Sequence, residues 1–183
     1  MDVEDLEYLE PEQAASASNA LPAPDDDVPP PQSGPKAVAR LIEYARGRCI
    51  ALPTHTTYAL IENPEAAPVP GAASHAYGLL TWQDMRLPMI DVNALLHADS
   101  GAKPASAPRY ALIVAYQRQV LGPLAYGAIG LSELPYTVLI GDEAQCALPT
   151  DSGLWPLLAL SCFLHEGQAV PILNTTRLFA AHG

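Results

Sequence analysis

The sequence has few cysteines and none of the common catalytic or metal-binding motifs. Its three cysteines, Cys49, Cys146 and Cys162, are widely spaced and form no CxxC pair. This pattern predicts buried, reduced thiols and argues against a disulfide framework or a zinc site. A nucleophile elbow, a P-loop, a zinc-binding HExxH pair and a GxGxxG loop are also missing. We therefore expect a protein without enzymatic activity, bound metal or cofactor.

Long apolar runs and an excess of positive charge are missing as well. No stretch of about 18 apolar residues could span a bilayer, and the first residues are acidic, unlike those of a secretory signal peptide. Residues 1–35 hold nine acids and no Lys or Arg, whereas the remainder carries 11 acids against 9 bases. We expect a cytoplasmic protein that inserts into no membrane and binds no nucleic acid.

Residues 1–36 are predicted to form a disordered acidic tail. The segment is rich in Ala, Ser, Asp and Pro, so it cannot bury enough apolar surface to offset the entropy of ordering. Val3, Leu6 and Leu9 recur at helical spacing beside Tyr8, and this short motif could fold onto an additional partner. The alternative, which the composition favours, is a solvated arm that aids solubility.

Residues 37–183 contain short β-rich segments separated by turn residues. Arg46-Gly47-Arg48, Gln83-Asp84 and His165-Glu166-Gly167 each stand between two apolar segments, an arrangement typical of hairpins. Prolines at 64, 68 and 70 argue against regular structure in the crossing 64–77. Strands at short, regular intervals predict an all-β fold of two similar five-stranded barrels, packed side by side with short helical turns. Barrel one is expected at about 37–98 plus a closing strand from the C-terminal part, the linker at 97–108, and barrel two at about 109–180.

One motif occurs twice, as PMIDVNALL at residues 88–96 and as PILNTTRLF at residues 171–179. Pro88 and Pro171 lack an amide hydrogen, which places each at an edge or a bulge of its strand. Asp91 and Asn174 are predicted to N-cap a helical turn, and the apolar pairs at 95–96 and 178–179 to cover the open barrel end. Asn can cap a helix but cannot act as a base, so its equivalence to Asp91 argues against a catalytic carboxylate.

The remaining chemically distinctive side chains indicate no site. The five histidines, at 55, 75, 97, 165 and 182, show no metal-ligand spacing and are predicted to lie on the surface. Ser152 has Asp151 beside it but no histidine nearby in the sequence. Trp155 is predicted to be core, whereas Trp82 has two open interpretations, a partner anchor or a cover for a barrel end.

Two segments carry a resemblance to a known family: YGLLTWQDMRLPMIDVNALL at 77–96 and LSCFLHEGQAVPILNTTRLF at 160–179. They resemble the CheW-like adaptor domain of bacterial chemosensory systems, with gapless spacing from Gly78 through Pro88 to Asp91, and the similarity extends over about 38–180. The resemblance implies two fused SH3-like barrels without catalysis. It also implies an adaptor that couples the regulatory domain of a CheA-type histidine kinase to the cytoplasmic tips of chemoreceptors, through the groove between the barrels and an exposed barrel edge.

The sequence departs from the family pattern at three polar positions. Gln83-Asp84 stands where the family has Arg-Gly, Ala59 where it commonly has Glu, and Tyr126 where it has an acid. These departures predict a divergent adaptor, for example in a type IV pilus or twitching-motility pathway, and make receptor contact the least expected of the implied partners.

Positions that match the family's groove are the candidate partner-binding residues: Thr57, Ala59, Gly78, Gln83 and Asp84 in the first barrel, and Tyr110, Ala111, Gly122 and Ala128 in the second. Each could instead serve only core or edge packing, and the two glycines only backbone geometry. The alternative function is a small-ligand-binding or hydrolytic β-barrel that uses the crossing 64–77.

Overall fold

The computed structural model describes residues 34–104, 106–119 and 121–180, with Ala180 described by its backbone alone. These residues belong to one compact unit. The predicted tail, including its Val3, Leu6, Tyr8 and Leu9 motif, lies outside the described residues apart from positions 34–36.

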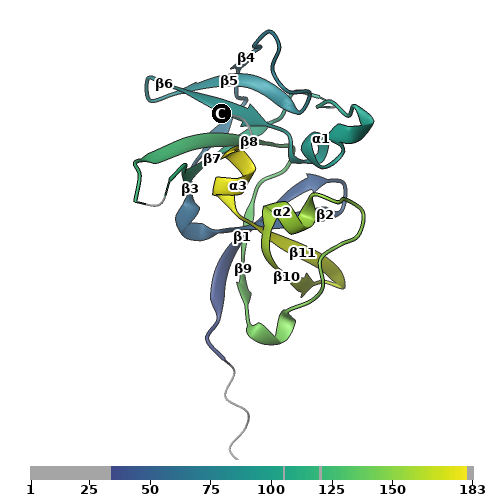
Figure 1. Ribbon diagram of the computed structural model, residues 1–183. Coiled ribbons are helices and arrows are strands. Elements are labelled where there is room, and N and C mark those ends of the chain that lie inside the picture. Colours follow the sequence, from purple (N-terminus) through teal and green to yellow (C-terminus); the bar gives the residue numbers. More distant parts are fainter. Residues whose placement is uncertain (1–33, 105, 120, 181–183) are drawn as a thin grey trace, which may run out of the picture. The chain divides into compact units, whose positions relative to one another are not determined.

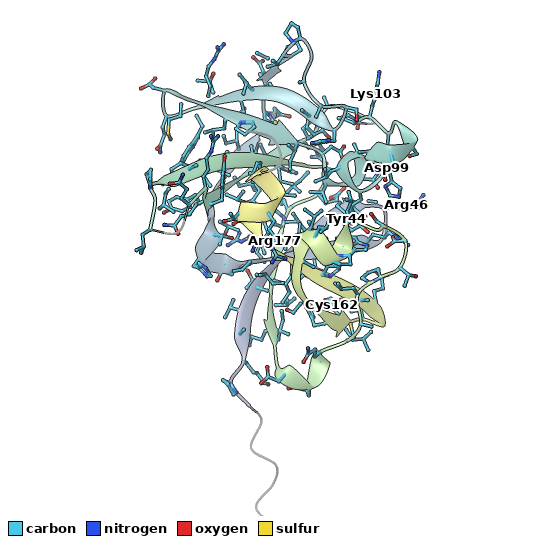
Figure 2. The ribbon with its side chains drawn as sticks, in the orientation of Figure 1. Tyr44, Arg46, Asp99, Lys103, Cys162 and Arg177 are labelled. Carbon is cyan, nitrogen blue, oxygen red and sulfur yellow. The ribbon has the colours of Figure 1, made fainter. Side chains whose placement is uncertain are left out.

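The elements follow one another in this order: β1 (Ala37–Ala45), β2 (Arg48–Pro53), η1 (Thr54–Thr56), β3 (Thr57–Glu62), β4 (Ala66–Ala67), β5 (Ala76–Trp82), β6 (Met85–Ile90), α1 (Val92–Leu96), η2 (Ala98–Ser100), β7 (Tyr110–Gln117), β8 (Leu124–Leu131), β9 (Tyr136–Ile140), η3 (Asp142–Ala144), α2 (Trp155–Leu158), β10 (Ala159–His165), β11 (Gln168–Leu173) and α3 (Thr175–Ala180). The predicted hairpin turns are confirmed at Gly47, Gln83-Asp84 and Glu166-Gly167, which all have positive φ. Arg46 lies in the turn between β1 and β2, and Tyr44 lies near the end of β1 (Figure 2).

The strands form two sheets, which confirms the predicted all-β fold (Figure 1). Sheet A has the order β10-β11-β2-β1-β9, and sheet B has the order β3-β7-β8-β6-β5-β4. Sheet A has the expected five strands. Sheet B has a sixth because β4, from the Pro-rich crossing where no regular structure was expected, pairs with β5 through Ala66–Leu80 and Ala67–Leu79.

The two sheets exchange strands between the halves of the chain. β1 and β2 precede the linker 97–108 but share sheet A with β9, β10 and β11, which follow it. β7 and β8 follow the linker but pair with β3 and β6 of the first half. The structure therefore divides the chain differently from the predicted barrels at 37–98 and 109–180. Each half contributes its first hairpin to one sheet and its later strands to the other.

The repeated motif occupies equivalent settings in the two sheets. β6 pairs in parallel with β8, and β11 pairs in parallel with β2. The amide of Asp91 donates to the His75 carbonyl and that of Asn174 to the Leu158 carbonyl, both at 2.9 Å. Both predicted caps are confirmed, because Asp91 Oδ1 accepts from the Ala94 amide at 2.9 Å and Asn174 Oδ1 accepts from the Arg177 amide at 3.1 Å.

The two motif prolines lie in interior strands, so the expected edge position is wrong. β6 lies between β5 and β8, and β11 between β10 and β2. Registered parallel pairing begins at the residue after each proline, at Met89 and Ile172. At the position of each proline, the strand is therefore paired in register with its antiparallel neighbour only. The pairing of both hairpins is irregular just beyond it, so the missing amide is tolerated.

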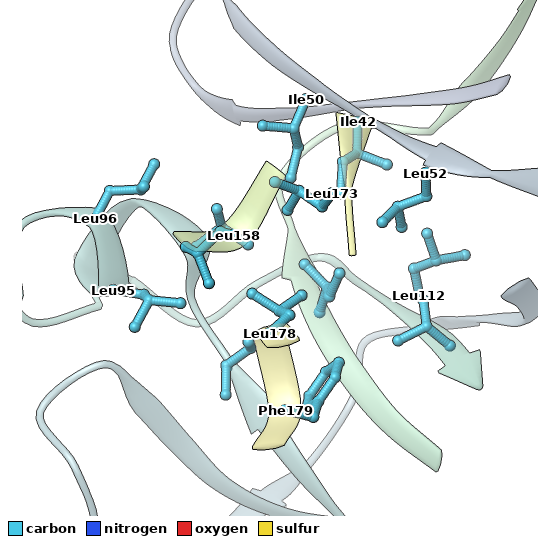
Figure 3. Close-up of a cluster of buried hydrophobic side chains, with 14 of the residues drawn as sticks. Ile42, Ile50, Leu52, Leu95, Leu96, Leu112, Leu158, Leu173, Leu178 and Phe179 are labelled. Carbon is cyan, nitrogen blue, oxygen red and sulfur yellow. The ribbon is translucent and has the colours of Figure 1, made fainter. Parts of the chain in front are cut away.

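The largest hydrophobic cluster lies between the two sheets and takes side chains from both, together with α1, α2 and α3 (Figure 3). Its members include the apolar pairs Leu95-Leu96 and Leu178-Phe179, all at most 7% exposed. These pairs are thus part of the core between the sheets, whereas the prediction placed them over the open end of each barrel. A second cluster fills the inner side of sheet B and a third that of sheet A. The space between the sheets is thus packed with side chains, and a surface cavity of about 300 Å³ is lined by residues of η1, β3, β7, β8 and α3.

The cap of α1 allows a test with a matched pair of substitutions. Asp91 also accepts a hydrogen bond from the Tyr77 hydroxyl at 2.9 Å, and burial together with Asp91 raises the pKa of Tyr77. Asp91→Ala removes the cap and leaves a half-buried hydroxyl without its acceptor, so we expect a loss of about 2 kcal/mol in the free energy of unfolding. Asp91→Asn, which copies Asn174, should retain most of it. Urea denaturation measures both, and an equal loss in the two variants would contradict the cap.

Candidate partner-binding surface

Ala111 and Ala128 are fully buried, so the prediction that they touch a partner is wrong. Both are 0% exposed and belong to the cluster inside sheet B. They lie on the neighbouring strands β7 and β8, where Ala128 pairs with Ile113. Alternate residues of β7 face two different cores, with Leu112 and Val114 in the cluster between the sheets and Ala111 and Ile113 in the other. No face of this strand remains for a partner.

The two candidate glycines have positions that the backbone itself explains. Gly78 is buried at φ 131°, and a Cβ there would collide with the Ala67 carbonyl of the adjacent strand β4. Gly122 closes the turn between β7 and β8, where its amide donates to the Gln119 carbonyl at 2.9 Å and its carbonyl accepts from Gln117 Nε2 at 3.1 Å.

Thr57 and Ala59 flank an irregularity at the start of β3. The pairing of β3 with β7 shifts register between these two residues, and the Thr57 hydroxyl donates to the Thr54 carbonyl at 2.8 Å. Ala59 packs against the cluster inside sheet B. The shift leaves the intervening Tyr58 52% exposed.

Gln83, Asp84 and Tyr110 are accessible to different degrees. Gln83 and Asp84 form the exposed tip of the β5–β6 hairpin, with φ of 46° and 63°, as a type I′ turn requires. Tyr110 is half-buried against the cluster between the sheets, and the Arg109 guanidinium lies 5.5 Å from its ring centroid. Of the nine candidates, the hairpin tip is the pair most available to another protein.

Three aromatic side chains meet near this hairpin, and we call them the aromatic end of sheet B. The Tyr126 ring lies 5.1 Å from that of Tyr58 and 5.4 Å from that of Trp82, centroid to centroid. Hydrogen bonding to Tyr58 raises the pKa of Tyr126. Trp82 and Tyr126 also pack against the cluster inside sheet B, so Trp82 covers the core at this point.

The three departures from the family pattern converge at the aromatic end. Tyr126 belongs to it, Ala59 follows Tyr58 in the chain, and Gln83-Asp84 follows Trp82. Positions far apart in the sequence thus change together beside one aromatic group, and at one of them, Tyr126, an aromatic ring stands where the family pattern has an acid. Each departure could be identified from the sequence. That they lie near one another could not, because it depends on the contacts among β3, β5 and β8 in the fold.

Sheet A presents exposed apolar side chains on both of its edge strands. Leu139 of β9 is 68% exposed and pairs in register with Val38 of β1, which is 46% exposed. On the other edge, Leu160 and Leu164 of β10 are 57% and 54% exposed. A surface cavity of about 330 Å³ lies between the two edges and is lined by Val38, Phe163 and neighbouring residues. An edge strand with apolar side chains is a natural template for another protein.

The loop around Ser152 is held by structural contacts. The Ser152 hydroxyl donates to the Leu96 carbonyl at 3.0 Å and accepts from the Leu154 amide at 3.2 Å. Asp151 accepts from Trp155 Nε1 at 2.7 Å and forms an ion pair with Arg48. Burial by itself would raise the pKa of Asp151, but the hydrogen bonds from Trp155 and Arg48 hold it below its usual value. These contacts anchor the loop and engage both Ser152 and Asp151 in structural roles.

Within the described part of the chain, no three His, Cys, Asp or Glu side chains gather in a way that could hold a metal ion. Nor is any described helix long and apolar enough to cross a membrane. The prediction that the histidines lie on the surface is wrong for His75, which is only 5% exposed.

Comparisons with known proteins agree with this architecture. The family model of the CheW-like domain matches residues 41–182. No curated protein sequence matches the chain significantly. Among solved structures, the crystal structure of the scaffolding protein TtCheW from Thermoanaerobacter tengcongensis aligns with a TM-score of 0.60 at 11% identity, over 79% of this chain and 93% of that chain. At this identity the likeness shows a shared fold.

Proposed function

We propose, from the premise that the chain belongs to the CheW-like domain family, that it is a non-catalytic adaptor coupling a CheA-type histidine kinase to chemoreceptors. The observation that carries the proposal is the family match over nearly the whole described body. An adaptor needs only surfaces and a coupling free energy between two binding events. Isothermal titration calorimetry with the regulatory domain of a CheA-type kinase tests it, and the absence of binding at micromolar concentrations would contradict it.

The edge of sheet A is the surface we propose for the kinase. Leu139 and Val38 lie side by side there, and β9 offers an unpaired strand edge. Exposed apolar side chains at a strand edge can be buried against a second β-module that adds its own strand to the sheet.

Leu139→Asp is therefore expected to weaken kinase binding at least about tenfold, because a charge would be buried against an apolar partner. Leu139 is 68% exposed, so the free energy of unfolding should change by less than about 0.5 kcal/mol. Leu121→Asp is the matched control, since Leu121 is 95% exposed in the β7–β8 turn of sheet B. Calorimetry on the three proteins measures the effect. Equal affinities for Leu139→Asp and the unsubstituted protein would place the kinase elsewhere.

The aromatic end of sheet B is the surface we propose for the receptor. Tyr58, Tyr126 and the Gln83-Asp84 tip are accessible there. Aromatic contacts depend less on ionic strength than the ion pairs they replace. We propose on this basis a divergent adaptor of a type IV pilus or twitching-motility pathway, working in the cytoplasm at chemosensory arrays.

Removal of residues 1–33, followed by comparison of the proteins captured by the intact and shortened chains, tests whether the tail binds an additional partner.

The alternative, a ligand-binding or hydrolytic barrel that uses the crossing 64–77, has less support. That segment lines a surface cavity of about 390 Å³ whose walls are mainly Val, Ala, Leu and Ile side chains. A specific ligand site needs several convergent polar groups, and His75 is the titratable side chain among those walls. Side-chain clusters fill the inner sides of both sheets.

A further inference from the structure

Two of the three cysteines lie side by side where the segment that follows β9 contacts strand β10 of sheet A. The Sγ atoms of Cys146 and Cys162 are 3.5 Å apart, although the residues are 16 positions apart in the chain. The Cys146 amide donates to the Cys162 carbonyl at 3.0 Å, and the preceding residue pair, Gln145 and Phe163, forms an antiparallel bridge. Adjacent residues across an antiparallel pair are well placed for a disulfide. The two sulfurs need to approach by only about 1.5 Å to reach bonding distance.

The pair is located at the seam of sheet A, the junction between the segment that follows β9 and the edge strand β10. β9 and β10 are the two ends of the sheet order, so contacts here close the sheet on itself. Cys162 lies among the strands of this sheet (Figure 2). It is 4% exposed, but it also lines the 330 Å³ cavity between the edges, while Cys146 is half-buried. A small solute can therefore approach both sulfurs.

We propose that Cys146 and Cys162 form an oxidative modification site, at which a small hydroperoxide converts the two thiols into a disulfide across the seam of sheet A. The Cys146 thiol gives up its proton and its sulfur attacks one peroxide oxygen. The O–O bond breaks, a sulfenic acid forms on Cys146, and the departing hydroxide takes the released proton and leaves as the first water. The Cys162 sulfur then attacks the sulfenic sulfur, so that an S–S bond forms and the S–O bond breaks. The departing hydroxide takes the Cys162 proton and leaves as water. The two thiols lose two electrons, and hydrogen peroxide becomes two waters.

The environment sets the order of these steps. Burial raises the pKa of the Cys162 thiol to about 12, so it carries little thiolate at neutral pH and is suited to the second step. Cys146 is the more accessible sulfur and takes the first. Cys49 is an internal control, because burial raises the pKa of its thiol as well and neither of the other cysteines is paired with it across its strand, where it faces Glu43.

Intact mass, thiol counting and peptide mapping test the proposal on the full chain treated with dilute hydrogen peroxide. We expect a mass loss of about 2 Da, a fall from three alkylatable thiols to one, and a cross-link between the Cys146 and Cys162 peptides. The melting temperature should rise by roughly 6–12 °C for a loop of this length, and a dithiol reductant should reverse every change. In Cys162→Ser, a sulfenic-acid trap should label Cys146.

Serine variants and an unfolded reference keep the outcome interpretable. Cys49→Ser should oxidise like the unsubstituted protein, whereas Cys146→Ser and Cys162→Ser should lose the intramolecular product. In concentrated urea the preference for the Cys146–Cys162 pairing should disappear, because the folded seam no longer brings the sulfurs together. The proposal is overturned if the folded protein keeps three free thiols, or forms its disulfide through Cys49 or between chains. It is equally overturned if a single cysteine is over-oxidised without a cross-link. None of these results depends on kinase or receptor binding.

Discussion

Trp155→Ala is expected to lower the free energy of unfolding by about 3–5 kcal/mol, the loss typical of deleting a large buried aromatic side chain. Trp155 is 0% exposed and belongs to the cluster between the two sheets. Small domains are stable by only about 5–15 kcal/mol, so this one truncation should remove roughly a fifth of the total or more. Urea denaturation followed by circular dichroism measures the change.

The loss of stability is expected to be this large because the Trp155 indole connects α2 to strands β1 and β2, which are far from it in the chain. It extends from α2 to meet the Tyr44 ring of β1 edge-on at 5.9 Å, and its Nε1 donates to Asp151 at 2.7 Å. Asp151 in turn forms an ion pair with Arg48 of β2. The truncation therefore opens a cavity and also leaves a carboxylate without one of its donors, and the two costs add.

Trp82→Ala is the matched control for this prediction. Trp82 loses the same indole, but it is half-buried at the aromatic end of sheet B and contacts Tyr126 at 5.4 Å. We expect its loss to cost about 1 kcal/mol, close to the value of an aromatic pair with partial burial. If the two variants lost equal stability, the packing between the sheets would not be the main source of stability.

The local features of this fold were predictable from the sequence because each depends on a few neighbouring residues. The hairpin tips, such as Gln83-Asp84, depend on which residues tolerate positive φ. The caps at Asp91 and Asn174 depend on a side-chain oxygen three residues before an orphan amide. The repeated motif also predicted the buried pairs that follow each cap, because the pattern of apolar residues is read within a single helical turn.

The pairing of the strands was not predictable in the same way. Either hairpin β1–β2 or hairpin β7–β8 has the pattern needed to complete either sheet, so periodicity alone does not say that the halves exchange them. The burial of Ala111 and Ala128 follows from this exchange. β7 lies between two cores, and Ala111 and Ala128 pack with Leu80, Leu87, Met89 and Ile113 on the inner side of sheet B.

Contacts between segments that are distant in the chain were not predictable from the sequence, for the same reason. Tyr58, Trp82 and Tyr126 come from three strands, and Cys146 and Cys162 from the two sides of the seam of sheet A. The count and spacing of cysteines predicted buried, reduced thiols, yet Cys49 and Cys146 are half-buried. Only the closure of the sheet brings two of the three sulfurs together.

Gly78→Ala is expected to cost about 3–5 kcal/mol, because two separate penalties fall on one position. The backbone of Gly78 has φ 131°, in a region that is essentially restricted to glycine and costs other residues of order 1–3 kcal/mol. In addition, the new Cβ would collide with the Ala67 carbonyl carbon and oxygen. That obstacle is backbone, so no side-chain rotation relieves it, and overpacking adds a further 1–3 kcal/mol or so.

Gly153→Ala is the control that separates this steric requirement from the general effect of adding a methyl group. At Gly153 no heavy atom lies within 4 Å of the place that an added methyl group would take, and φ is not positive, so the substitution should be neutral or slightly stabilising. Thermal unfolding compares the two variants, and kinase affinity is then measured at a temperature where Gly78→Ala remains folded. We expect that affinity to be unchanged once the folded fraction is counted, because Gly78 is buried. A stable Gly78→Ala protein with weakened binding would instead make Gly78 a contact residue, as the family resemblance first implied.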